Sequence, residues 1–159
     1  MKKLALVIMG VIAIGGGALS YQFSRADFST LQGEKLTWRE LQGDWIVLNY
    51  FAEWCVPCLK EVPELNAFSH AIDGHNIQLF AASFDALNAT ELAALKSKYD
   101  MHFALIQSFP EPKLPVTKPQ QLPATFLISP EGKVVKTLLG EQTQDSLFNA
   151  IARAKQAQS

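Results

Sequence analysis

The chain has 159 residues, a formal net charge of −1 and 48 % hydrophobic residues. This length suits one domain, and the hydrophobic content suits a packed core, which excludes a disordered chain. No basic stripe runs through the sequence, so no nucleic-acid partner is indicated.

The chain opens with an apolar segment. Two lysines, at positions 2 and 3, precede an uncharged run over residues 4–23. A helix over this run is long enough to anchor the chain in a membrane, and the Ala-Leu-Ser at 18–20 also fits signal-peptide cleavage. Residues 1–24 are therefore predicted to be a membrane anchor or a signal peptide, and residues 25–159 the folded domain. Both interpretations place that domain outside the cytoplasm, in the periplasm or its equivalent, because the lysines stay inside.

Strands and helices alternate in the rest of the chain. Hydrophobic runs and turn residues predict a hairpin over residues 28–31 and 35–38, buried strands over 45–51 and 77–84, and a third strand over 102–106. An antiparallel pair is predicted over 124–129 and 133–139. Helical spacing predicts helices over 58–72, 90–99 and 143–154, the last capped by Thr143, and one helical turn over 38–41. The predicted fold is α/β: a mixed central sheet flanked by helices on both faces, with an N-terminal β-hairpin extension.

Cys55 and Cys58, the only cysteines, follow the strand over 45–51 directly. The carboxyl ends of parallel strands are where such sheets carry their sites. Thiol–disulfide exchange needs a thiolate, and a helix N-terminus lowers the pKa of a cysteine there. Cys58 lies one turn deeper, and Pro57 stiffens the turn without losing a hydrogen bond. The pattern predicts that Cys55 attacks a disulfide and that Cys58 resolves the mixed disulfide.

Other uses of the cysteine pair are less well supported. A disulfide across so short a segment closes almost no loop and stabilises little. A zinc site with His70 and His75 is excluded, because a continuous helix would hold Cys58 and His70 about 18 Å apart. The alternative that stays open is an exported module that binds and delivers Cu(I) without redox turnover, since thiolates suit Cu(I). No metal ligand or cofactor is assigned.

The stretch NYFAEWCVPCLKEVPEL, residues 49–65, resembles the active-site segment of thioredoxins. The resemblance is closer to the exported TlpA/ResA/DsbE-like branch, which has an asparagine at the position of Asn49 and the Cys-x-x-Glu-x-Pro pattern of Cys58, Glu61 and Pro63. The stretch QLPATFLISPEGKVV is similar to a second segment of that branch and puts Pro123 in its cis-proline position. The likeness covers roughly residues 28–155 and implies a thioredoxin fold with a redox-active Cys55–Cys58 disulfide.

The resemblance also suggests roles for neighbouring residues. Glu61 is expected to exchange a proton with the resolving thiol, although a solvated helix position is the alternative. A cis bond before Pro123 would leave the backbone of Leu122 free to pair with an extended client, whereas a trans proline would only open an edge strand. Trp54 is either a flat docking rim beside Cys55 or a packing residue.

The family likeness implies a reductant that acts on disulfides of exported proteins and receives electrons from a membrane donor. One segment departs from the family pattern. The proline-rich segment (residues 109–122) replaces the short helix that usually precedes the cis-proline. It is either a stiff surface connection or a loop that selects the partner, and it gives no support to a specific role in cytochrome c maturation.

Overall fold

The computed structural model describes residues 26–158, and its central strand is β3 (Trp45–Phe51). All seven residues of β3 are buried, as expected for an apolar strand that is covered on both faces. The predicted buried strand is therefore confirmed. The expected segment over 4–23 lies outside the described residues, and none of the helices within residues 26–158 is long and apolar enough to cross a membrane.

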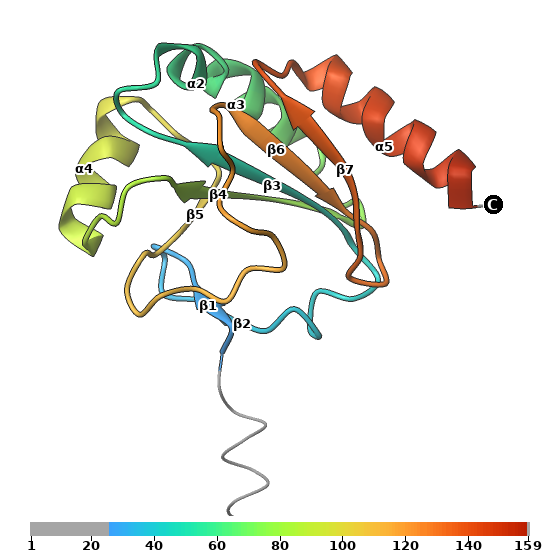
Figure 1. The fold of residues 1–159 in the computed structure, drawn as a ribbon, viewed down its shortest axis with the longest axis horizontal. Coiled ribbons are helices and arrows are strands. Elements are labelled where there is room, and N and C mark those ends of the chain that lie inside the picture. Colours follow the sequence, from blue (N-terminus) through green and yellow to red (C-terminus); the bar gives the residue numbers. More distant parts are fainter. Residues whose placement is uncertain (1–25, 159) are drawn as a thin grey trace, which may run out of the picture.

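The predicted mixed sheet is confirmed, with the strand order β5-β4-β3-β6-β7 (Figure 1). β3 pairs in parallel with β4, and β4 with β5, whereas β6 is antiparallel to β3 and β7 is antiparallel to β6. The other strands are β4 (Ile77–Ser83), β5 (Ala104–Ile106), β6 (Ala124–Ile128) and β7 (Val134–Leu139). The helices are α2 (Val56–Lys60), α3 (Val62–Ala71), α4 (Ala89–Lys98) and α5 (Gln144–Gln158).

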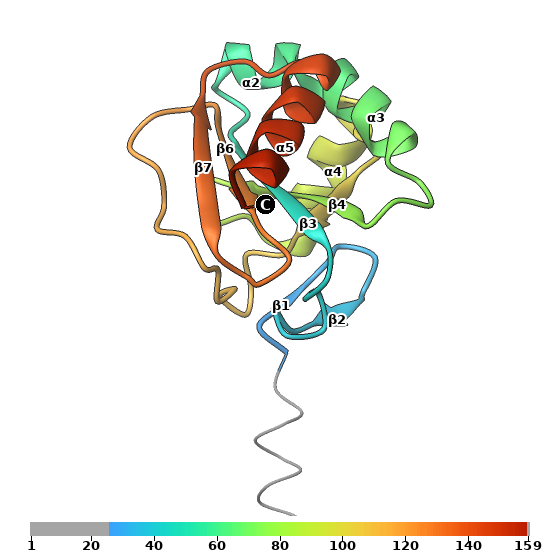
Figure 2. The ribbon, with the colours of Figure 1, turned by 90° about the vertical axis from the view of Figure 1, so that its right-hand side faces the viewer.

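The two faces of the sheet pack against different structures. Val47 and Phe51 of β3 belong to a buried cluster that includes side chains of α3, α4 and α5. Ile46 and Leu48 belong to a second cluster, to which the hairpin and the proline-rich segment contribute and in which no described helix takes part. Figure 2 shows the helices together on one side of the sheet and the hairpin and the proline-rich segment on the other.

The expectation of helices on both faces is thus wrong for this chain. The crossovers from β3 to β4 and from β4 to β5 step in the same direction across the sheet, and right-handed crossovers of one direction lie on one face. The connection that could have carried a helix to the opposite face is the proline-rich segment, which contains neither helix nor strand. Its prolines lack the N–H groups that a helix needs.

The opposite face is covered in part by the predicted N-terminal hairpin, β1 (Phe28–Ser29) and β2 (Lys35–Leu36). Phe28 packs against Trp38 and Phe80, with ring centroids 5.0 Å and 5.3 Å apart. The hairpin is shorter than expected, and residues 38–43 form hydrogen-bonded turns rather than one helical turn. A bridge between Thr30 and Ile106 ties the hairpin to the edge of the sheet.

The helix ends follow local sequence signals. The predicted helix over 58–72 is divided at Glu61, which ends α2 and begins α3, because Pro63 cannot donate to the preceding turn. Asn88 begins α4 with a capping box, and the predicted cap Thr143 accepts the Ser146 N–H at 3.2 Å.

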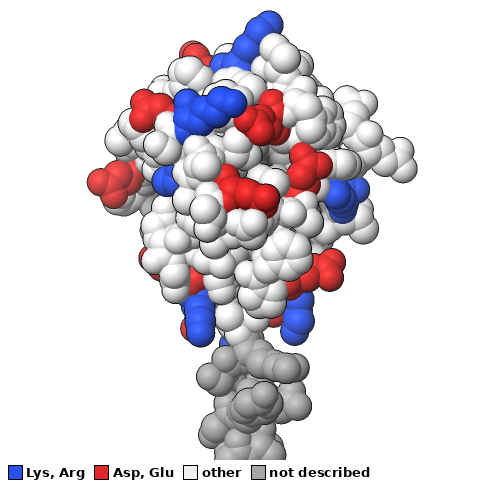
Figure 3. Space-filling view, turned by 90° about the vertical axis from the view of Figure 1, so that its left-hand side faces the viewer, with Lys and Arg blue, Asp and Glu red and all other residues white. Residues whose placement is uncertain are grey.

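Figure 3 shows the side on which α4 lies, where acidic and basic side chains are interspersed without a large patch of one sign.

Candidate active site

The two cysteines lie where the chain leaves β3 and enters α2, at the carboxyl ends of the parallel strands. Cys55 is the N-cap of α2, and Cys58 lies within it. The pair forms a disulfide, with 2.08 Å between the sulfurs and 5.3 Å between the Cα atoms. The backbone N–H of Cys58 donates a hydrogen bond to Cys55 Sγ at 3.3 Å. Since the N-terminal N–H groups of a helix have no partner within the helix, this one is available to stabilise negative charge on Cys55.

The residues that flank Cys55 form an exposed apolar rim. Trp54 is 62 % exposed and Val56 is 60 % exposed, whereas Cys55 itself is only 5 % exposed. The Trp54 indole packs edge-on against Phe84, with 5.9 Å between ring centroids, and its Nε1–H donates to Asp85 Oδ2 at 2.9 Å. The tryptophan is therefore held in place at the surface beside the disulfide, with most of its ring open to solvent.

Pro123 lies next to the carboxyl end of β3, because Ala124 pairs with Tyr50 in the antiparallel register of β6. The Leu122–Pro123 peptide bond is cis. The Pro123 carbonyl accepts the Gly140 N–H at 2.9 Å, which ties this bend to the end of β7. Leu122 packs against both buried clusters. β3 and β6 thus bring the Pro123 bend and the cysteines to the same end of the sheet, where the parallel strands have their carboxyl ends.

Glu61 is buried, with 1 % of its surface exposed, and belongs to a polar cluster beneath the cysteine helix. Its Oε1 accepts a hydrogen bond from Asn49 Nδ2 at 2.6 Å, and its Oε2 accepts one from the Gln142 backbone N–H at 3.1 Å. Asn49 Nδ2 also donates to Thr125 Oγ1 at 3.1 Å. The alternative of a solvated helix position for Glu61 is therefore excluded.

Burial is the main influence on the Glu61 carboxyl and raises its pKa to about 7, while the Gln142 and Asn49 hydrogen bonds act in the opposite direction. A carboxyl with this pKa is divided between its protonated and ionised forms near neutral pH. It is therefore able both to accept and to release a proton under ordinary conditions.

Two members of this cluster were not predicted from the sequence. Thr125 faces Asn49 directly across the β3–β6 pair, and Gln142 follows the turn after β7. Neither residue belongs to the cysteine motif. The position of Thr125, two residues after Pro123, indicated that it lies near the site. Its pairing with Asn49, however, depends on the register between β3 and β6, which the sequence does not specify. Asn49 Oδ1 has no hydrogen-bond partner among the described residues.

The three histidines, including His70 and His75 of the excluded zinc site, are exposed at the surface. His70 and His102 lie edge to face with 5.9 Å between ring centroids, and His75 Nδ1 lies 3.1 Å from the Asp73 carbonyl oxygen. Within residues 26–158, no three or more His, Cys, Asp or Glu side chains are grouped so that they could hold a metal ion.

Sequence comparisons agree with the cysteine geometry. A family model for the AhpC/TSA family matches residues 20–137. The thiol-disulfide oxidoreductase ResA of Bacillus cereus is 31 % identical over 119 residues, which cover 74 % of this chain and 67 % of that protein. ResA of Bacillus subtilis is 30 % identical over 118 residues, with 74 % and 65 % covered.

Solved structures agree with the fold. StoA from Bacillus subtilis superposes with a TM-score of 0.65 at 21 % identity, over 77 % of this chain and 92 % of that one. A putative thiol:disulfide interchange protein DsbE from Chlorobium tepidum superposes with a TM-score of 0.67 at 20 % identity, over 80 % and 90 %. The chain therefore belongs to the AhpC/TSA family, has the thioredoxin fold and is a thiol–disulfide oxidoreductase similar to ResA.

Proposed function

We propose that this protein reduces disulfides of exported client proteins outside the cytoplasmic membrane. The observation that carries this proposal is the Cys55–Cys58 pair at the start of α2, beside an exposed Trp54. The short sequence separation argues against a role in stabilising the fold. A dithiol that passes electrons to other proteins explains both the position of the pair and its apolar rim.

The Cys55 thiolate attacks one sulfur of the client disulfide, and the other client sulfur leaves as a thiolate. The resulting mixed disulfide joins Cys55 to the client. Cys58 then attacks Cys55 Sγ, which releases the second client thiol and forms the Cys55–Cys58 disulfide. Two electrons pass to the client, and a membrane-bound dithiol donor restores the reduced pair.

Glu61 acts as the proton acceptor for Cys58 in the resolving step. It follows Cys58 by three residues on the helix, and its pKa of about 7 suits proton transfer near neutral pH. Asn49 and Gln142 position the carboxylate through the hydrogen bonds described above. The proton returns from Glu61 when the pair is reduced again.

The client is held by the residues around the disulfide. Trp54 offers an apolar surface next to Cys55, and the bend at Pro123 lies at the same edge of the sheet. Neither the N–H nor the carbonyl of Leu122 forms a hydrogen bond with another described residue. These groups pair with an extended client strand and present its disulfide to Cys55.

The apolar run over 4–23 and the lysines before it support a location in the periplasm or its equivalent. Residues 1–24 act as a membrane anchor or as a cleaved signal peptide, and residues 25–159 form the thioredoxin-like domain. An anchor would keep the domain close to a membrane donor.

Replacing Cys58 with serine tests the proposal, because it leaves Cys55 free to attack and removes the resolving thiol. The full-chain variant is produced in a cell that exports it, free thiols are blocked by alkylation, and its disulfide-linked partners are separated on non-reducing gels and identified. We expect exported proteins joined to Cys55. Cys55→Ser is the matched control and should join to none of them.

Equal capture by both variants would contradict the assignment of Cys55 as the attacking thiol. If neither variant captures a protein and the reduced wild type binds Cu(I) with one ion per pair, the Cu(I) delivery alternative replaces the proposal.

A further inference from the structure

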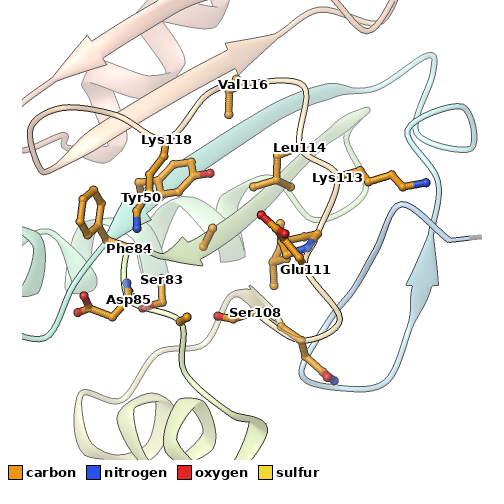
Figure 4. Close-up of a pocket in the computed structure, with 15 residues that line it drawn as sticks. Tyr50, Ser83, Phe84, Asp85, Ser108, Glu111, Lys113, Leu114, Val116 and Lys118 are labelled. Atoms are coloured by element: carbon orange, nitrogen blue, oxygen red, sulfur yellow. Dashed lines mark hydrogen bonds between the residues drawn. The ribbon is translucent and has the colours of Figure 1, made fainter.

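A cavity of about 370 Å³ lies between the proline-rich segment and the carboxyl ends of β3, β4 and β5 (Figure 4). This volume is at the lower end of the range for binding pockets of small ligands. The proline-rich segment forms one wall, and the strand ends form the other. The polar and aromatic lining includes Tyr50, Ser83, Phe84, Ser108, Glu111 and Lys118.

The Tyr50 hydroxyl is the unusual group in this cavity. Tyr50 is 6 % exposed, and its ring packs edge-on against Phe126 with 6.1 Å between centroids. Its hydroxyl forms no hydrogen bond with another described residue, and the oxygen atom itself is not sealed from the cavity. In Figure 4 this hydroxyl points from β3 toward Leu114. It is therefore free to bind a group that enters the cavity.

Two serines add further donors. Ser83 Oγ accepts the Asp85 N–H at 3.2 Å, and Ser108 Oγ accepts the Leu87 N–H at 3.3 Å. Each hydroxyl is thus held in place by the bond that it accepts, and its own hydrogen is left to donate. The wall of the cavity therefore offers three hydroxyl groups to an occupant.

The charges around the cavity balance. Lys113 and Lys118 line it together with Asp85 and Glu111. Lys118 Nζ lies 3.9 Å from the centroid of the Phe84 ring, where a cation is attracted to the aromatic face. The two lysines and the two carboxylates give the lining no net charge, so an occupant of either sign would meet repulsion as well as attraction, whereas a neutral polar occupant can pair with both kinds of group.

The cavity is joined to the active site through shared residues. Phe84 and Asp85 line it and also hold Trp54 in place, through the ring contact and the hydrogen bond described above. Trp54 immediately precedes Cys55. A polypeptide bound at the disulfide is therefore within reach of the cavity with residues near its own cysteine.

We propose that this cavity is a recognition subsite that takes an Asn or Gln side chain from the client, near the disulfide that is reduced. This inference rests on the proposed function. The carboxamide oxygen accepts from the Tyr50 hydroxyl, and the carboxamide nitrogen donates to the Glu111 carboxylate, which faces the same space in Figure 4. The proline-rich segment thereby selects the client by a side chain rather than acting as a surface connection alone.

A peptide series tests this subsite. Each nine-residue peptide carries one central cysteine as a mixed disulfide with thionitrobenzoate, and Gln, Glu, Lys or Leu at one flanking position that is varied along the peptide. The reduced full-chain protein in detergent is mixed with each peptide, and the release of thionitrobenzoate is followed. We expect Gln, at one or two positions, to raise the second-order rate about fivefold over Leu, which is about 1 kcal/mol.

Tyr50→Phe should remove this preference, because it deletes only the hydroxyl. Tyr99→Phe is the matched control, since its hydroxyl bonds to Glu53 outside the cavity, and it should keep the preference. Val116→Trp, which fills the cavity from the proline-rich segment, should also remove it and serves if Tyr50→Phe does not fold.

Other outcomes separate the subsite from the proposed function. The subsite is overturned if no position prefers Gln, or if Tyr50→Phe and Val116→Trp both keep the preference. The free disulfide of thionitrobenzoate has no side chain for the cavity, so wild type and both variants should reduce it at equal rates. A wild type that reduces neither that disulfide nor any peptide would contradict the proposed function itself.

Discussion

Glu61 combines a buried position with a proton that is easily exchanged. Its carboxyl lies at the junction of α2 and α3, where burial, two hydrogen bonds and the nearby charge of Glu141 all influence its pKa. Burial disfavours the ionised form and dominates, whereas hydrogen bonds from Gln142 and Asn49 favour it. This balance is what places the group in the range useful for a thiol reaction near neutral pH.

Replacing Glu61 with glutamine should remove a pH dependence of stability. The folded-state pKa is about 7 and the usual value is 4.5, so the folded protein holds this proton more tightly than the unfolded chain does. The stabilisation is complete below about pH 4.5 and is lost as pH rises through about 7, which amounts to about 3 kcal/mol. Urea unfolding of the oxidised protein between pH 4.5 and 8 should show this loss in wild type and not in Glu61→Gln. Glu34→Gln, an exposed carboxyl, controls for charge.

At the scale of single residues, the sequence predicted the thiol–disulfide chemistry of the cysteine pair but not the residues that hydrogen-bond to Asn49 and Glu61. Cys55, Cys58 and Glu61 lie within one motif, so their order along a helix was visible. Thr125 and Gln142 contact that motif from 76 positions beyond Asn49 and 81 positions beyond Glu61. Such contacts depend on strand register and on the turn after β7, and neither follows from a local pattern.

Individual elements begin and end where short-range signals are strongest. α4 is an example, because its capping box satisfies backbone groups at both ends of the motif: Asn88 Oδ1 accepts from the Thr90 and Glu91 N–H groups, and Glu91 Oε2 accepts from the Asn88 N–H. These bonds supply partners for N–H groups that the helix itself leaves unpaired.

Asn88→Ala should therefore lower the free energy of unfolding by about 1 kcal/mol, since alanine offers no acceptor to the first turn. Thr90→Ala is the matched control, because the Thr90 side chain is exposed and forms no part of the capping box. Urea unfolding followed by circular dichroism measures both. Equal losses in the two variants would show that the cap contributes nothing beyond helix propensity.

The predicted elements were mostly correct because their patterns are local. The apolar run of β3 and the Pro-Glu-Gly turn before β7 identified their strands directly. The turn over 38–43 was harder to assign, because only a few residues separate the hairpin from Gly43 and a single turn has little periodicity. Strand β5 is shorter than predicted, since pairing with β4 covers only Ala104–Ile106.

Over residues 26–158 the molecule has an asymmetric sheet, with helices on one face and mainly irregular structure on the other. Sequence patterns predicted which segments are helical but not which face each one covers. That placement follows from the direction of the crossovers and from the proline-rich segment, which occupies the position of a possible further helix. The hairpin and this segment therefore have to shield the second core cluster themselves.

Phe28→Ala tests how much the hairpin contributes to the fold. Phe28 is 3 % exposed and packs on Trp38 and Phe80, so its loss should destabilise the protein by about 3–5 kcal/mol. Phe109→Ala is the matched control: this ring is 58 % exposed, and its loss should change stability by about 0.5 kcal/mol or less. Equal effects in urea unfolding would mean that the hairpin does not cover the core.

The claim that the Cys55–Cys58 pair acts as a reductant is tested most directly by its reduction potential. A strongly oxidising disulfide is one whose reduced dithiol form is stabilised. In this protein the buried carboxyl of Glu61, three residues after Cys58, carries no positive charge and therefore does not stabilise a Cys58 thiolate. The pair is equilibrated with glutathione buffers, and its alkylated and disulfide forms are counted by mass spectrometry. We predict a potential at or below about −200 mV, in the range of thioredoxin and glutaredoxins. A value near about −120 mV, that of the oxidant DsbA, would contradict the account.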